Sequence, residues 1–468
     1  MIVVKLIGHD SFYGIGDVLR LFFSGIKEDR DRSLVTADGS LELSIISEVS
    51  EGKVFTYLEG DKRTEDTLEP IDVKRAVKRS LYSFLSNLTD TSFPWGCLTG
   101  IRPTVVATEE NYSEESLIKK YLVREDKARL ASITGRIENT LLESISLDSL
   151  NVYVGVPFCP SRCEYCSFIS KDVLHHLNML SEYEEALSRE FKVAGKSLGR
   201  NIETLYLGGG KPTVFEDKVF AKLLEDIRSN LPITGLKEFT CEAGRPDTIT
   251  EFKLDAMKDA GVGRICINPQ TMRSETLSKL NRKHSAEDII DAYKLARSKE
   301  FDVINMDLIA GLKYETSGDY IYSVKTLIDL DPENITVHTL YKKRRAEMSR
   351  DDVMDYNMER GMVDDAVKEG YELLMDAGYV PYYMYRQKDT GHGLENIGFA
   401  KKGTECHYNV AMMTDKRDVL SFGAGGMSKR IFEGNRYERC PCTKDIHSYI
   451  RDPEHFAMKK IQFFTEDT

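Results

Sequence analysis

The sequence predicts an α/β protein whose main part is a partial TIM-type barrel of six strand–helix units. A small N-terminal α+β domain and a C-terminal α+β extension flank this barrel. Three observations predict the fold class. From residue 151 onward, short apolar runs alternate with helical stretches, which indicates a parallel sheet because parallel neighbours need crossover connections. The apolar runs number six, which suits an open barrel better than a closed barrel of eight, and the first 150 residues lack the alternation.

The predicted N-terminal domain, residues 1–150, begins with a short strand and an apolar helix. Two alternating segments separated by Gly then predict a β-hairpin. The mixed-charge stretch KEDRDR, residues 27–32, is expected to be a solvated loop, and Pro94–Pro103 is rich in turn residues. In chain order, the predicted elements are strand Val3–Ile7, helix Gly16–Phe23, hairpin strands Leu41–Ile46 and Val54–Leu58, helix Val73–Leu88, and two helices within Ser113–Ile145.

The predicted barrel occupies residues 151–350, and its chemistry is expected at the carboxyl ends of the strands. Its six apolar runs are Val152–Phe158, Thr204–Leu207, Phe239–Glu242, Arg264–Asn268, Val303–Ile309 and Ile335–Leu340. The helical patterns between them are Tyr183–Leu198, Lys218–Leu231, Glu251–Ala260, Ala286–Lys299 and Tyr320–Ile328. The extension, residues 351–468, is expected to cover the barrel mouth. It begins with a helix, Tyr356–Ala377, and continues with the strand-like YVPYYMYRQ and the Gly-rich LSFGAGGMSK.

Composition excludes several classes of protein. The 468 residues carry a net charge of −12, which argues against general nucleic-acid binding. No stretch approaches the roughly 20 apolar residues of a membrane helix, and the first residues lack a secretory signal, so a cytoplasmic protein is expected. Nine Cys in such a chain predict free thiols rather than structural disulfides, and clustered Cys indicate metal or redox chemistry.

Three cysteines, Cys159, Cys163 and Cys166, follow the first barrel strand in VPFCPSRCEYCSF. Three thiolates on one short loop can bind an iron–sulfur cluster. A zinc site and three incidental Cys are the alternatives. Zinc normally takes a fourth ligand from a paired C-x2-C, which does not follow here, although the distant Cys440 and Cys442 could supply one. A four-iron cluster with three Cys ligands keeps one iron open to the amino and carboxylate groups of a small molecule.

Polar and glycine residues follow the other barrel strands. The triple glycine Gly208–Gly210 ends the second strand, and such a turn lets backbone amides approach a ligand closely. Glu242 ends the third strand, where a lone Glu is more often a surface residue. Asp307 lies in an otherwise apolar strand, where an acid is rare without a partner. The expected polar ring at the barrel mouth consists of Glu242, Gln270, Arg282 and Asp307.

These motifs together resemble the radical S-adenosylmethionine (SAM) superfamily. The Cys spacing, the aromatic Tyr165 before the last Cys and the glycine loop about 40 residues later are typical of it. A narrower resemblance is to the oxygen-independent coproporphyrinogen III dehydrogenases, through VYVGVPFC, LYLGGGKPT, EFTCEAGRPDTI, INPQT and NMDLIAGL. The segments PWGCLTGIRP, VHTL and YRQK…LENIGFAKKG resemble the HemZ-type branch, so the likeness covers nearly the whole chain.

The resemblance implies a partial (βα)6 barrel of the radical SAM type, a [4Fe–4S] cluster and SAM as cofactors. It assigns the cluster to Cys159, Cys163 and Cys166. The separation of 12 between Gln270 and Arg282 fits the family. Weaker SAM contacts are expected at Tyr341 and Met427. The residues implied to contact SAM are Tyr153, Gly209, Gly210, Glu242, Gln270, Arg282 and Asp307.

The implied reaction is the oxidative decarboxylation of two propionates of coproporphyrinogen III to the vinyl groups of protoporphyrinogen IX, in oxygen-independent haem biosynthesis. A 5′-deoxyadenosyl radical would take hydrogen from the β-carbon of each propionate. The implied partners are a tetrapyrrole substrate and a small electron-donor protein of the flavodoxin or ferredoxin type. Two alternatives remain, a haem-binding or haem-trafficking protein and a radical SAM enzyme that acts on haem itself.

Three positions depart from the family pattern. Gly155 stands where the best-studied members have a His, and Phe168 stands where they have a fourth Cys. Lys211 replaces the first Thr of the glycine loop GGGTPT. That Thr belongs to a region that can hold a second SAM, so Lys211 brings a cation into this region.

Further side chains each have a functional and a structural interpretation. The basic run Lys342–Arg345, with Arg386 and Lys388, could bind propionates or be solvated. Cys406, Cys440 and Cys442 could hold a second cluster or be free thiols. His392 and His407 could donate protons or serve packing. The single Trp, Trp95, is expected to pack at the domain junction.

Overall fold

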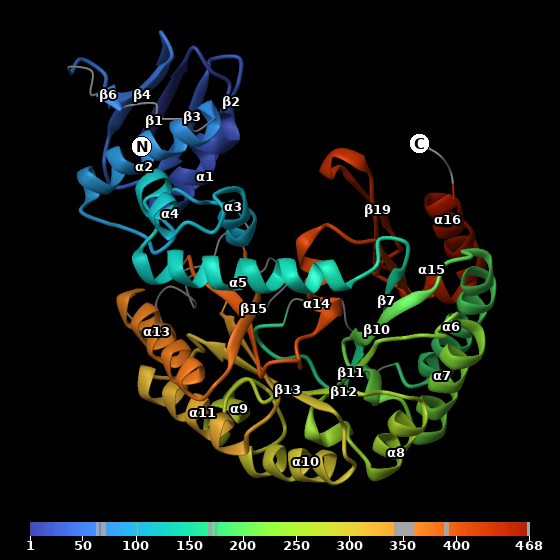
Figure 1. Cartoon of the computed structure of the whole chain (residues 1–468). Helices are drawn as coiled ribbons and strands as arrows, with labels where there is room; N and C mark the ends of the chain where they lie inside the picture. The colour runs from blue at the N-terminus through green and yellow to red at the C-terminus, as the bar shows by residue number, and fades with distance from the viewer. Residues whose placement is uncertain are drawn as a thin grey trace. The chain divides into compact units, whose positions relative to one another are not determined.

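The structure of the protein is a computed structural model that describes residues 1–61, 65–66, 72–100, 102–166, 171–173, 176–340, 360–387 and 393–465. These residues form two compact units (Figure 1). The first unit comprises Met1–Arg136 and Tyr385–Glu395. The second comprises Ile137–Met384 and Asn396–Thr468. The division at about residues 150 and 350 stays a prediction.

The first unit contains a six-stranded sheet in the order β2-β3-β1-β4-β5-β6. The hairpin expected from the sequence is confirmed, because β4 and β5 pair antiparallel. The expected loop at residues 27–32 is partly wrong, since Lys27–Asp29 belong to the edge strand β2. An edge strand has one exposed side, so charged residues fit it. The strands are β1 Ile2–Ile7, β2 Ser24–Asp29, β3 Leu34–Asp38, β4 Leu43–Ser50, β5 Lys53–Leu58 and β6 Glu65–Asp66.

Five helices accompany this sheet, and the last of them continues into the second unit. The side chain of Asp72 caps α2 by accepting a hydrogen bond from the Arg75 N–H at 3.1 Å. The two helices expected within Ser113–Ile145 are confirmed, whereas α3, which follows the turn-rich segment, was not predicted. The helices are α1 Phe12–Phe22, α2 Val73–Thr89, α3 Pro103–Glu109, α4 Glu114–Tyr121 and α5 Glu125–Ser144.

The second unit is built on an 11-stranded sheet in the order β15-β16-β14-β13-β12-β11-β10-β7-β17-β18-β19. Its central strands are parallel, and the six predicted barrel strands are confirmed as β7 Leu150–Val156, β10 Ile202–Gly209, β11 Glu238–Gly244, β12 Arg264–Ile267, β13 Val303–Ala310 and β14 Asn334–Thr339. The described strands leave two sheet edges, β15 and β19, so the barrel is open, as the six-unit pattern predicts.

The C-terminal part of the chain adds strands to the same sheet. Val419–Phe422 forms β17, a seventh parallel strand beside β7, which sequence periodicity did not reveal. The other added strands are antiparallel or lie at the edges: β15 Val380–Arg386, β16 Glu395–Ala400, β18 Met427–Ile431 and β19 Tyr437–Pro441. A separate two-stranded sheet joins β8 Phe158–Cys159 and β9 Lys171–Asp172.

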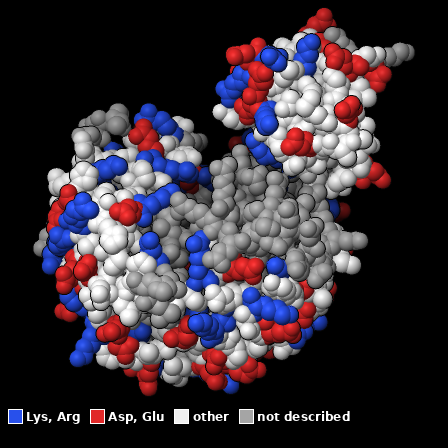
Figure 2. Space-filling model, turned by 180° about the vertical axis from the view of Figure 1, so that it is seen from behind, with Lys and Arg blue, Asp and Glu red and all other residues white. Residues whose placement is uncertain are grey.

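Helices line the outer face of the curved sheet (Figure 1). None of the described helices is long and apolar enough to span a membrane. On the face seen in Figure 2, acidic and basic side chains are intermixed among the residues drawn in colour. The helices of this unit are α6 Asn178–Ser197, α7 Asp217–Asn230, α8 Glu251–Asp259, α9 Ser274–Lys279, α10 Ala286–Ser298, α11 Ser317–Leu330, α13 Arg360–Asp376, α14 His407–Thr414, α15 Ile446–Arg451 and α16 Pro453–Thr465.

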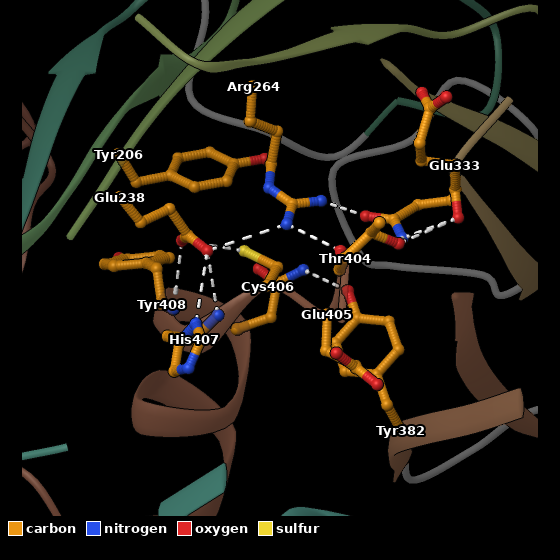
Figure 3. Close-up of polar contacts among 12 residues, drawn as sticks. Tyr206, Glu238, Arg264, Glu333, Tyr382, Thr404, Glu405, Cys406, His407 and Tyr408 are labelled. Carbon is orange, nitrogen blue, oxygen red and sulfur yellow. Dashed lines mark hydrogen bonds and ion pairs between the residues drawn. The ribbon is translucent and has the colours of Figure 1, made fainter. Parts of the chain in front are cut away.

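A buried charge network closes the amino ends of the barrel strands (Figure 3). Glu238, at the start of β11, accepts backbone N–H bonds from His407 at 2.9 Å and Tyr408 at 3.2 Å, so it caps α14. It also accepts a hydrogen bond from the Cys406 thiol at 3.1 Å and forms an ion pair with Arg264 at 3.6 Å. Burial alone would raise the pKa of Glu238, but Arg264 and the hydrogen bonds outweigh burial and lower it to about 2.

This network predicts an acid-sensitive fold. Because the folded-state pKa of Glu238 lies below its ordinary value of 4.5, its stabilisation is present above pH 4.5 and disappears as the pH falls towards 2. Glu238→Gln should therefore lower the free energy of unfolding by about 3 kcal/mol at pH 7 and flatten its dependence on acid pH. Urea unfolding between pH 7 and pH 3 measures both effects.

A matched control is Glu405→Gln, in the loop before α14, since Glu405 accepts a hydrogen bond from the exposed Gly403 N–H at 2.9 Å. This variant should change stability by less than about 0.5 kcal/mol. Equal effects of the two substitutions would contradict the role assigned to Glu238.

Candidate functional site

The residues that the sequence singles out lie at the carboxyl ends of neighbouring parallel strands. Cys159 is in β8, directly after β7, and Gly210 follows β10. Glu242 lies in β11 and Asp307 in β13. Parallel strands end at the same edge of their sheet, so these side chains share one side of the second unit.

The cysteine loop is held by hydrogen bonds to the segment around Asn281. The Ser161 hydroxyl donates to the Asn281 carbonyl at 3.2 Å, and the Asn281 amide donates to the Arg162 carbonyl at 2.8 Å. Within the loop, the Cys166 N–H donates to the Cys163 carbonyl at 3.0 Å. None of the three cysteines, Cys159, Cys163 and Cys166, forms a disulfide, and Cys163 is buried.

The glycine loop lies directly against the cysteine loop. A Cβ on Gly210 would lie 2.4 Å from the Phe158 carbonyl oxygen and 2.9 Å from the Cys159 Sγ. Gly209 has φ +118°, and a Cβ there would lie 2.6 Å from the Val156 carbonyl oxygen. Only glycine fits both positions, so the close backbone approach expected from the sequence is present, and here it is an approach to the thiol.

Arg282 joins the cysteine loop to the end of β12. Its guanidinium donates to the Tyr165 hydroxyl at 2.9 Å and to the Asn268 carbonyl, and it lies 4.0 Å from the Cys163 Sγ. The side chain is buried, and its Nε has no hydrogen-bond partner in the part of the chain that the structure describes. A permanent cation therefore lies beside one thiol of the loop.

Two carboxylates at the site differ in their partners. Glu242 accepts hydrogen bonds from the Tyr206 hydroxyl and from the Asn268 amide at 2.9 Å. Burial, together with the charge of Asp307, raises the pKa of Glu242. Asp307 accepts from the Asn305 amide at 2.7 Å and lies 3.7 Å from the His338 ring. A cationic ligand at this position would relieve the repulsion between the two acids.

His338, in β14, is a site residue that the sequence did not single out, although it belongs to the VHTL segment. Burial alone would lower the pKa of His338, but its contacts with Asp307 and Asn396 outweigh burial and raise it. Its ring nitrogen lies 3.3 Å from the Asn396 side-chain oxygen. The sequence signal for His338 is a polar residue in the sixth barrel strand, next to the fifth strand that carries Asp307.

Tyrosine rings fill the barrel interior beside Glu242. Tyr153 stacks on Tyr206 and Tyr408, with ring centroids 6.3 and 6.4 Å away, and Tyr206 stacks on Tyr408 at 4.8 Å. A Cβ on Gly155 would lie 3.1 Å from the Tyr153 ring, so this ring borders the space that a His would need. Tyr408 comes from the C-terminal part of the chain, which explains why local sequence did not reveal it.

Gln270 lies just beyond β12 and has a positive φ of +70°. Its N–H donates to the Asp307 carbonyl at 2.8 Å, and its own carbonyl accepts from the Ile309 N–H at 2.9 Å. The backbone thus fastens Gln270 to β13. A non-glycine residue in this conformation is uncommon, and such positions concentrate at functional sites.

Other predicted residues lie elsewhere or outside the described residues. Phe168, Tyr341, the run Lys342–Arg345, Lys388 and His392 are outside the described residues. Met427 starts β18 and is exposed. Arg386, in the first unit, donates to the Leu98 carbonyl and to the Gly393 carbonyl at 2.9 Å, and stacks on the Trp95 ring; it is buried, so it is not the solvated side chain of the second interpretation. Trp95 itself is buried and donates to Glu395 at 2.7 Å; its place at a domain junction stays a prediction.

The remaining cysteines form no disulfide, and the choice between free thiols and a second cluster at Cys406, Cys440 and Cys442 stays a prediction. Cys406 binds Glu238 at the opposite, amino ends of the barrel strands, and His407 lies 3.8 Å from the same carboxylate (Figure 3). Cys440 and Cys442 are buried at β19, and burial raises the pKa of both thiols. His407 thus has a structural contact rather than a position at the barrel mouth.

The donor set at the mouth fits an iron–sulfur cluster. Thiolates are the usual ligands of such clusters, and here three occur on one loop beside a glycine cradle and a buried cation. Among the described residues, no group of three or more His, Cys, Asp or Glu side chains surrounds the position of a single metal ion. Thiolates around a four-iron cube are spread farther apart than the ligands of one ion.

Comparisons with known proteins agree with this geometry. Residues 153–327 match the family model of the radical SAM superfamily. The chain is 33% identical to the oxygen-independent coproporphyrinogen-III oxidase-like protein HemZ of Bacillus subtilis, over 84% of this chain and 81% of that protein. It is 30% identical to the heme chaperone HemW of the same organism, over 59% of this chain and 69% of HemW.

A solved structure shows the same fold. Coproporphyrinogen III oxidase (HemN) from Escherichia coli, which is described as a radical SAM enzyme, superposes with a TM-score of 0.53 at 21% identity. The likeness covers 68% of this chain and 72% of that one.

The glycine cradle predicts a specific loss of iron. A methyl group at Gly210 must displace either the Phe158 carbonyl or the Cys159 thiol, so Gly210→Ala should bind markedly less iron after anaerobic reconstitution while the chain stays folded. Gly361→Ala, where a Cβ meets nothing within 4 Å, is the matched control. Iron and sulfide analysis with circular dichroism measures both properties, and full iron content in Gly210→Ala would contradict the prediction.

Proposed function

Because the chain belongs to the radical SAM superfamily, in the group of coproporphyrinogen III oxidase-like proteins that includes HemZ, we propose that it oxidatively decarboxylates coproporphyrinogen III. Two propionates would become the vinyl groups of protoporphyrinogen IX. The observation that best supports this proposal is the likeness to HemZ over 81% of that protein's length, together with the cysteine loop at the barrel mouth.

Proteins of this superfamily bind a [4Fe–4S] cluster and SAM, and this chain does so as a member. We assign the cluster to Cys159, Cys163 and Cys166. When bound and reduced, it supplies the electron that cleaves SAM and so generates the radical that takes hydrogen from a propionate β-carbon. The residues that we assign to SAM are Tyr153, Gly209, Gly210, Glu242, Gln270, Arg282 and Asp307.

The protein's own contribution is charge and exclusion of water. Glu242 and Asp307 provide two half-buried carboxyl groups that complement the cationic ammonium and sulfonium groups of SAM. Arg282 fixes Tyr165 and the Cys163 side of the cysteine loop. The tyrosine rings at Tyr153 and Tyr206 exclude water beside the carboxylates, which protects a reactive intermediate from side reactions.

The partners follow from the same assignment. The electron would come from a small flavodoxin- or ferredoxin-type protein. The substrate would be a tetrapyrrole with four carboxylates, so cations should bind it. In the sequence, Lys342–Arg345 begin three positions after the last residue of β14, and we propose them for this role. Haem binding is the second candidate function, because the heme chaperone HemW is also among the relatives.

The central test follows SAM cleavage and porphyrin mass together. Anaerobically reconstituted protein with SAM, a reductant and coproporphyrinogen III should form 5′-deoxyadenosine while the porphyrin loses two carboxyl groups as carbon dioxide. Cys163→Ala should abolish both products, because it removes a thiol of the candidate cluster site. Cys440→Ala, at a buried cysteine on β19, should leave both products in place.

Formation of 5′-deoxyadenosine without any change in porphyrin mass would contradict the proposed substrate and leave the radical chemistry intact. Haem titration, followed by visible absorption, then tests the second function. Stoichiometric haem binding in that case would favour the chaperone-like function.

A further inference from the structure

A lysine of the glycine loop is buried beside the cysteine loop. Lys211 follows Gly210, and only 9% of its surface is exposed. Its side chain runs over Gly244, where a Cβ would lie 2.1 Å from the Lys211 Nζ. Gly244 has a φ of +73°, a conformation that favours glycine, and with no side chain there the ammonium group lies directly against the backbone.

The ammonium group of Lys211 makes no hydrogen bond or ion pair with any residue that the structure describes. Buried ammonium groups normally have partners, because an unpaired buried charge is costly. Lys253, another buried lysine of the same barrel, shows the usual arrangement. Its Nζ donates to the Thr213 and Thr248 carbonyls at 2.8 and 3.2 Å.

The surroundings of Lys211 contain further polar atoms without partners. Both ring nitrogens of the buried His284 lack partners among the described residues, as does the Nε of Arg282. Burial and the charges of Arg282, Arg245 and Lys211 lower the pKa of His284 to about 3, so the ring is neutral. Burial, with the charge of Arg282, likewise lowers the pKa of Lys211 to about 8, while the Cys159 thiol and Glu242 oppose this shift.

No carboxylate among the described residues forms an ion pair or hydrogen bond with the Lys211 ammonium group, although the charge of Glu242 acts on it. Glu242 already accepts hydrogen bonds from Tyr206 and Asn268, and Arg245 is paired with Asp247 at 2.7 Å. A ligand that brings a negative charge would satisfy the ammonium group of Lys211. The ligands of the proposed function carry carboxylates, one on the methionyl end of SAM and four on coproporphyrinogen III.

We propose that Lys211 binds a ligand carboxylate at the candidate site. This inference rests on the proposed function for the identity of the ligands. The position of Lys211 beside the cysteine loop favours the carboxylate of SAM, and a propionate of the tetrapyrrole is the other source of the same chemistry. The burial of Lys211 and the absence of a partner for its ammonium group among the described residues carry the inference.

The test compares binding of ligands with and without the carboxylate. In reconstituted protein, Lys211→Met should weaken SAM binding about 10- to 100-fold, because a charged hydrogen bond is lost. Decarboxylated SAM should bind equally well to both proteins. If the carboxylate belongs to the substrate, the loss should instead appear for coproporphyrinogen III and not for its tetramethyl ester. Equilibrium binding measures each affinity without turnover.

Lys253→Met is the matched control for a structural role. It should lower the unfolding temperature, because it removes bonds to two carbonyls, and it should leave SAM affinity unchanged. Lys211→Met should not lower the unfolding temperature of the ligand-free protein, since it removes an unpaired buried charge. Lys211→Gln repeats the comparison with a polar side chain.

Two results would overturn the inference. One is unchanged affinity of Lys211→Met and Lys211→Gln for both carboxylate ligands. The other is a loss of stability as large as that of Lys253→Met, since this would assign Lys211 a structural role. Failure of the chain to convert coproporphyrinogen III would contradict the proposed function alone, because the SAM comparison measures binding.

Discussion

The site depends on one close approach of two backbones. β7 and β10 pair as far as Gly209 and Val156, and the chain then passes the Phe158 carbonyl and the Cys159 thiol with no room for a side chain at Gly210. The register of two central barrel strands therefore fixes where the first cysteine lies. The backbones are closely packed here, because a Cβ at Gly209 or Gly210 would overlap backbone atoms.

The two ends of the barrel use buried charge differently. At the amino ends, the Glu238 carboxylate has hydrogen bonds from Cys406 and backbone N–H groups and an ion pair with Arg264, so these contacts stabilise the fold. At the carboxyl ends, polar atoms remain without partners among the described residues, including the Asn268 Oδ1 and the Arg282 Nε. Unsatisfied buried groups cost stability and are rare in native proteins, so those beside the cysteine loop are atoms that a ligand could satisfy.

The barrel strands could be predicted from the sequence because strands buried on both faces are continuous apolar runs between helical patterns. Glu242 and Asp307 could be predicted because acids in such runs stand out. The stack of Tyr408 on Tyr206 and the contact of His338 with Asp307 could not, since each depends on which strands and loops become neighbours in space. Lys211 could be singled out from the sequence because it replaces a Thr of the glycine loop. Its lack of a partner among the described residues is seen only in the structure.

The pairing of β7 with β17 has a consequence for how the protein is made. Asn151, in β7, binds the carbonyl of Asp418, which lies 267 positions later in the chain and directly before β17. During synthesis, the strand that leads into the cysteine loop therefore keeps an open edge until nearly the whole barrel has left the ribosome. Contacts of such long range form late and slowly. An exposed apolar edge strand can pair with other chains, so we expect the nascent protein to be prone to aggregation beside its cysteine loop.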